Sequence, residues 1–102
     1  MIAFALLLAA VALPHAQPDG GALFSRNCTA CHGEGGWGTR RLAARLAPDQ
    51  PALLAQRRDL DPEYVALVIR QGIGPMPPFR PTDLTAAEVR AIADWLTRGR
   101  HP

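Results

Sequence analysis

The sequence lacks several features that would indicate a nucleic-acid-binding protein or an enzyme. It contains no lysine, and its 11 basic residues, all arginine, stand against 9 acidic ones, so the formal net charge is only +2. A balance this mild argues against a nucleic-acid partner. The chain also has no recognisable set of catalytic nucleophile, acid and base. We therefore expect neither nucleic-acid binding nor an active site of its own.

Cysteine is scarce, which limits the kinds of metal site and cross-link that are possible. Cys28 and Cys31 are the only two cysteines. A structural zinc site needs four ligands, and besides His32 only His15 and His101 remain, one in the apolar N-terminal segment and one at the tail. A thioredoxin-like dithiol requires a βαβ context, and no stretch alternates as a strand would. A disulfide between the two cysteines is compatible with export, but it leaves the adjacent histidine without a role.

The sequence has no hydrophobic run long enough to cross a bilayer. Its longest run, Ile2–Leu13, matches the core of a signal peptide in length, although no basic residue precedes it. Small residues follow, and cleavage after Ala12 or Ala16 would start the mature chain near Gln17. We therefore predict a signal peptide over residues 1–16, a single domain over 17–102 and a periplasmic or otherwise exported protein. An uncleaved N-terminal membrane anchor is the alternative.

Short helices joined by irregular loops are the expected architecture, because 9 glycines and 10 prolines interrupt this small chain. Capping signals predict three helices. They run from Asp19 to about Cys28, from Asp61 to Gly72, and from Thr85, with Glu88 as its capping-box partner, to a stop at Gly99. A weaker pattern predicts a short helix around residues 42–47. The glycine-rich stretch 33–38 is expected to lack regular structure.

The stretch Cys28-Thr29-Ala30-Cys31-His32 is a C-x-x-C-H motif, the attachment signature of c-type haem. Two thiols add to the two vinyl groups of the haem, and their spacing matches the vinyl separation along one ring edge. The adjacent histidine then lies under the ring and supplies an axial nitrogen to the iron. Because this reading uses every cysteine of the chain, we predict one covalently bound haem c.

Met76 is the predicted second axial ligand. It is the only methionine besides the initiator, and it lies in the glycine- and proline-rich segment Gly72–Phe79. Packing in the core is the more common use of methionine, but these neighbours make a helix-packing role improbable. His101 is the poorer alternative, because chain ends are usually mobile. Ligation by a methionine would occupy the iron and so disfavour a haem sensor or small-ligand binder.

The chain resembles the class I c-type cytochromes in several motifs that occur in the same order as in that family. The resemblance extends from Asp19 to about Arg98. The matching features are Gly20, Phe24 and Cys28 at spacings of four, CTACHG at Cys28–Gly33, IRQGIGPMPPF at Ile69–Phe79, and Trp95-Leu96 in the last helix. The resemblance implies an all-α fold of three to five short helices and loops wrapped around one covalent haem. It also implies that the first and last helices cross, with Gly20 at their closest approach.

The resemblance further implies a function in single-electron transfer between redox proteins. The partners would be a donor and an acceptor such as a dehydrogenase, an oxidase or another cytochrome. The alternative is an electron-accepting cytochrome subunit of a flavoprotein or quinoprotein dehydrogenase complex. Trp37, Tyr64 and Arg70 are candidates to contact the haem propionates, and Arg70 is the best of them because buried carboxylates favour arginine partners.

Two further expectations concern the surroundings of the haem. The family usually orients the axial histidine through a hydrogen bond from Nδ1 to a backbone carbonyl beyond the glycine-rich loop, but no partner for His32 can be assigned from the sequence. Five arginines are concentrated between residues 40 and 58, namely Arg40, Arg41, Arg45, Arg57 and Arg58. They could steer an acidic partner, or they could simply form a solvated face.

Overall fold

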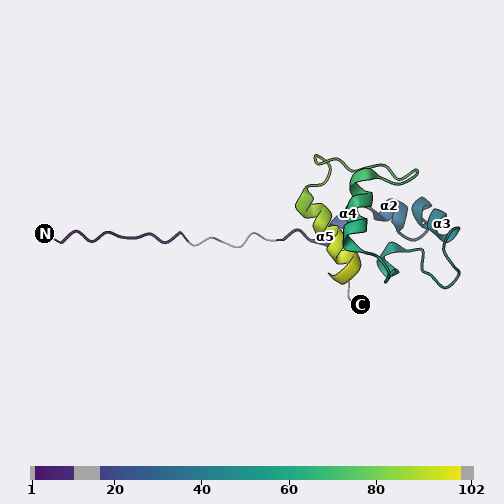
Figure 1. The fold of residues 1–102 in the computed structure, drawn as a ribbon, viewed down its shortest axis with the longest axis horizontal. Coiled ribbons are helices and arrows are strands. Elements are labelled where there is room, and N and C mark those ends of the chain that lie inside the picture. Colours follow the sequence, from purple (N-terminus) through teal and green to yellow (C-terminus); the bar gives the residue numbers. More distant parts are fainter. Residues whose placement is uncertain (1, 11–16, 100–102) are drawn as a thin grey trace.

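The computed structural model describes residues 2–10 and 17–99. Its helices are α1 (Gly20–Asn27), α2 (Thr29–His32), α3 (Trp37–Ala43), α4 (Pro62–Gln71) and α5 (Ala86–Asp94), with a 3₁₀ turn at Leu54–Gln56 and a π-helical turn at Trp95–Gly99 (Figure 1). The described residues contain no β-strand, only an isolated bridge between Ile73 and Met76. The fold is therefore all-α, as predicted.

The N-terminal apolar segment lies partly outside the described residues. Residues 2–10 are exposed and form no helix. The predicted cleavage positions, Ala12 and Ala16, fall outside the described residues, as do His15 and His101. No helix in the described ranges is long and apolar enough to span a bilayer.

The three helices that the sequence predicts with capping signals are confirmed. The Asp19 carboxylate accepts a hydrogen bond from Ala22 N at 3.1 Å at the start of α1. Asp61 accepts from two backbone N–H groups at the start of α4. At the start of α5, Thr85 and Glu88 form a complete capping box. Each cap satisfies N–H groups that the first turn of a helix leaves unpaired.

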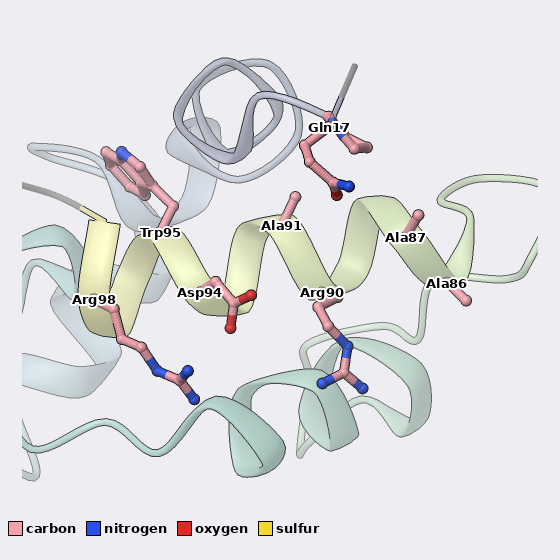
Figure 2. Close-up of a pocket in the computed structure, with 9 residues that line it drawn as sticks. Gln17, Ala86, Ala87, Arg90, Ala91, Asp94, Trp95 and Arg98 are labelled. Carbon is pink, nitrogen blue, oxygen red and sulfur yellow. The ribbon is translucent and has the colours of Figure 1, made fainter. Parts of the chain in front are cut away.

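Helices α1 and α5 cross at close range, and this crossing builds the core. A Cβ atom at Gly20 would lie 2.0 Å from the backbone oxygen of Ala91, so only glycine fits there. Figure 2 shows α1 almost end-on above α5. Beside the crossing, the ring centroids of Phe24 and Trp95 lie 5.1 Å apart, and the Leu96 side chain is buried. The close approach expected at Gly20 is thus present.

The region after the C-x-x-C-H motif differs from the prediction. Trp37 and Gly38, expected in an irregular loop, form the start of α3, and the short helix expected at residues 42–47 begins earlier and ends at Ala43. Packing explains the difference, because a Cβ at Gly38 would lie 2.9 Å from the Cys31 oxygen. The Thr39 hydroxyl also donates to the Gly33 oxygen at 2.7 Å. These contacts outweigh the poor helix propensity of glycine.

The C-terminal end of the last helix also differs. The sequence places Gly99 just beyond the end of the helix, whereas the structure includes it in the π-helical turn. In that turn the Thr97 hydroxyl donates to the Ala93 oxygen at 2.8 Å. A side-chain hydroxyl that donates to a backbone carbonyl of the preceding turn competes with the backbone N–H groups for that carbonyl, and this disturbs the regular hydrogen bonding of the helix.

Candidate haem site

The C-x-x-C-H motif lies at the junction of α1 and α2. Cys28 ends α1, where its N–H donates to the Phe24 oxygen at 2.8 Å, and its own carbonyl accepts from His32 N at 2.8 Å. Because Cys28 and His32 are four residues apart on one helical turn, their side chains lie on the same face. Cys28 is half-buried, Cys31 is exposed, and the two do not form a disulfide.

Two adjoining cavities lie beside this motif. The inner cavity has a volume of about 160 Å³ and is lined mainly by aliphatic and aromatic side chains from α1, α4 and α5, together with Cys28. The outer cavity, of about 270 Å³, is lined by Cys31, residues of α3 and the loop 73–77. Four residues line both: His32, Leu42, Ile73 and Met76. The structure therefore places both cysteines, the histidine and the methionine of the sequence prediction around these two adjoining cavities.

The loop that carries Met76 is fixed by backbone contacts at both ends. Ile73 N donates to the Met76 oxygen at 3.1 Å, and Met76 N donates to the Ile73 oxygen at 2.9 Å. Phe79 N donates to the Ile69 oxygen at 2.8 Å, which ties the loop to the end of α4. Gly72 enters the loop with φ 71°, and a Cβ there would lie 2.5 Å from the Met76 oxygen. A loop closed in this way holds the methionine in place without a helix.

Burial favours the neutral forms of His32 and Cys28. It lowers the pKa of His32, and the neutral imidazole is the form that binds a metal. Burial and the neighbouring Cys31 raise the pKa of the Cys28 thiol to about 11. The His32 Nδ1 atom is buried and has no hydrogen-bond partner among the described residues. The backbone acceptor that the resemblance implies is therefore not found there.

The three residues expected at the propionates lie in different places. Trp37 lines the outer cavity and Tyr64 lines the inner one. Arg70 lines neither cavity, and its Nη1 donates to the Phe79 oxygen at 3.3 Å. Arg57 does line the inner cavity. Its position depends on the path of the loop before α4, for which the local sequence gives no signal.

A larger hollow elsewhere on the surface offers no comparable chemistry. It has a volume of about 670 Å³ and lies along the outer side of α5, where Arg90, Asp94 and Arg98 project (Figure 2). Neither cysteine lines it. Within the described part of the chain, no three His, Cys, Asp or Glu side chains are grouped as a metal site would require.

The residues around the two cavities fit a covalently attached haem. Apolar walls suit a large flat ring, and the two thiols open onto adjoining halves of one space. The His32 imidazole stands at the boundary between the halves, where it can offer a ring nitrogen to a group bound there. Met76 lines the same boundary.

The comparison with protein families agrees with this assignment. The family described as "Cytochrome C oxidase, cbb3-type, subunit III" matches residues 15–96. No curated protein matches the sequence. Among solved structures, cytochrome c6C from Synechococcus sp. PCC 7002 is similar at 21% identity, covering 78% of this chain and 90% of that chain with a TM-score of 0.48. Since the family match spans most of the sequence, the chain belongs to this family of class I c-type cytochromes, which transfer electrons through covalently bound haem c.

Proposed function

We propose that the chain is a single-haem electron carrier in which Cys28 and Cys31 hold the haem while His32 and Met76 ligate its iron. The observation that carries the proposal is the shared boundary of the two cavities, which both His32 and Met76 line. When bound, the haem supplies an iron that gains or loses one electron between its ferric and ferrous states. We expect no catalytic residue in the chain itself.

The protein's own residues would keep such a group in place and out of water. The buried side chains of α1, α4 and α5 form the inner wall and exclude solvent. His32, neutral because of its burial, offers a ring nitrogen, and Met76 offers a thioether, a soft ligand that favours ferrous iron. The exposed side of Cys31 and the loop beside it leave one edge within reach of a partner.

The decisive experiment combines mass and spectrum of protein expressed with haem-maturation machinery. After acid–acetone extraction, the intact mass is expected to exceed that of the polypeptide by one haem. Replacing either cysteine by serine should leave only one thioether bond and lower the yield of holoprotein. Recovery of free polypeptide mass from matured, exported protein would refute the covalent assignment.

A second candidate is the same chemistry within a larger assembly, as a cytochrome subunit of a dehydrogenase complex or another respiratory complex. The matching family is named for a subunit of an oxidase. Size-exclusion of native extract, with detection of haem, separates a free carrier from a bound subunit.

The expected location outside the cytoplasm is part of the proposal. It rests on the apolar segment Ile2–Leu13, whose length suits a signal peptide. N-terminal sequencing of the exported protein tests it, because cleavage after Ala12 or Ala16 leaves a defined new terminus. A terminus that still contains the apolar segment would indicate the anchored form.

A further inference from the structure

The ring of His32 lies beside the start of α3. A Cβ atom placed on Gly38 would lie 3.2 Å from the Cε1 atom of His32, so little room remains there for a side chain. The same Cβ would lie 2.9 Å from the Cys31 oxygen, and a Cβ on Gly36 would clash with that oxygen as well. The backbone at the start of α3 is therefore packed closely on the C-x-x-C-H motif.

The Thr39 hydroxyl ties α3 to the end of this motif. It donates to the Gly33 oxygen at 2.7 Å and lies 3.4 Å from the Cys31 oxygen. These two carbonyls belong to the residues on either side of His32. One side chain of α3 thus contacts the backbone both before and after the histidine, and this contact fixes the histidine backbone relative to Gly38.

The orientation of the imidazole depends on packing. Nδ1 of His32 is buried and has no hydrogen-bond partner among the described residues. The torsion that turns a histidine ring about its Cβ–Cγ bond has broad minima, so rotamer preference alone does not fix the ring plane. The ring plane is therefore set by what lies beside it, and at Gly38 that neighbour is the backbone of α3.

We propose that Thr39 is a positioning residue for His32, because its hydroxyl holds the start of α3 on the motif and Gly38 then limits the rotation of the imidazole. This inference rests on the proposed function, in which His32 ligates the iron. It gives to a hydroxyl and a packing contact the role that a hydrogen bond of the ring usually has. Thr39 lines neither cavity, so it acts on a bound group only through His32.

The plane of the His32 ring is measurable in the ferric holoprotein. The orientation of an axial imidazole influences which iron d orbital holds the unpaired electron, and this distribution sets the hyperfine shifts of the haem methyl protons. The pattern of methyl resonances therefore reports the ring plane. A substitution that only lowers the stability of the fold leaves this pattern unchanged.

The test compares proton NMR spectra of wild type, Thr39→Val, Thr39→Ser and Thr97→Val. Thr39→Val removes the hydroxyl at nearly constant volume, so the methyl resonances should shift from their wild-type positions. Thr39→Ser keeps the hydroxyl and should retain the wild-type pattern. Thr97→Val is the matched control, because the Thr97 hydroxyl also donates to a backbone oxygen, that of Ala93 at 2.8 Å, and Thr97 lines neither cavity.

Three outcomes would overturn the inference. They are a wild-type methyl pattern in Thr39→Val, whatever its melting temperature, an equal shift in Thr97→Val, and a Thr39→Ser spectrum that matches that of Thr39→Val. A shift confined to Thr39→Val supports it.

Gly38→Ala keeps the inference testable if Thr39→Val yields no holoprotein. The added methyl group would meet the His32 ring at 3.2 Å and the Cys31 oxygen at 2.9 Å, so the methyl resonances of the haem should shift. Alanine is a better helix former than glycine, so weaker helix propensity cannot explain such a shift. An unchanged pattern in Gly38→Ala would overturn the inference, whereas absence of covalent haem from the wild type would instead refute the proposed function.

Discussion

At the scale of single residues, the position of Met76 follows from its neighbours. Its sulfur is carried by a loop in which Ile73 and Met76 exchange two backbone hydrogen bonds and Gly72 adopts φ 71°. A positive φ of this size is rare for residues other than glycine. The glycine therefore secures the path of the loop, and the loop secures the thioether at the boundary between the two cavities.

Met76→Ala should remove the thioether and leave the rest of the cavity in place. We expect the ferric sulfur-to-iron band near the red end of the spectrum to vanish and the reduction potential to fall by about 100 mV, within the span of about 0.8 V that axial ligands cover. The opened iron should then bind added imidazole. Ile73→Val, which keeps the loop, is the control and should retain the band. If the wild-type protein has no such band, Met76 is not the ligand.

At the scale of elements, the crossing of α1 and α5 depends on one missing side chain. A Cβ at Gly20 would meet backbone atoms of Ala91 at 2.0 and 2.7 Å and the Cβ of Trp95 at 2.8 Å. Backbone cannot move aside as a flexible side chain can. Any larger residue must therefore push the two helices apart.

Gly20→Val should lower the free energy of unfolding by about 1–3 kcal/mol, the usual effect of overpacking. Ala22→Val is the matched control, because Ala22 is exposed on the same helix and loses only a few tenths of a kcal/mol in helix propensity. Thermal unfolding of both holoproteins measures the difference. The His/Met absorption bands should persist in both variants, and an equal melting temperature would show that the crossing tolerates a side chain.

The capping box of α5 should make stability depend on pH. Hydrogen bonds from Thr85 lower the pKa of Glu88 below its ordinary value of 4.5. A carboxyl whose pKa is lowered by folding stabilises the protein above its unfolded pKa, and this contribution is lost as the pH falls through the folded value. The melting temperature of wild type should exceed that of Glu88→Ala at neutral pH, and the gap should narrow in acid. A gap independent of pH would contradict this assignment.

At the scale of the whole molecule, local signals in the sequence predicted the capped helices, whereas features that depend on long-range packing could not be predicted from them. The helices capped by Asp19, Asp61 and Thr85 are present because their caps act within four residues. The start of α3 was missed because it depends on packing of Gly38 against a carbonyl seven residues earlier in the chain. Which arginine reaches the inner cavity depends on the fold of an irregular segment, and no local pattern reports this.

The arrangement of charge around the outer cavity bears on the partner. Arg41 and Arg45 line that cavity, and Arg41 lies over the Trp37 ring at 5.3 Å from its centroid. Arg40 donates to the Gly35 oxygen nearby. Among the described residues, none of these three arginines forms an ion pair, whereas Arg57 pairs with Asp59. Arg41 and Arg45 line the same cavity as Cys31, so this positive charge lies beside the exposed cysteine. Helix α3, which carries Arg40 and Arg41, lies on the opposite side of the domain from α5 (Figure 1).

This charge should accelerate encounter with an anionic redox partner. With ferricyanide as an anionic oxidant, the rate of oxidation of the ferrous protein should fall as ionic strength rises, because salt screens charges beyond about 8 Å under physiological conditions. Replacing Arg40, Arg41 and Arg45 together by glutamine should lower the rate at low salt by roughly tenfold and flatten its salt dependence. Replacing Arg26, Arg90 and Arg98, which are exposed and line neither cavity, removes the same net charge and should have a smaller effect. A wild-type rate that does not change with ionic strength would contradict charge steering. Recognition would then have to depend on the apolar surface beside the methionine loop, where Ile73 is half exposed, or on a partner that stays bound.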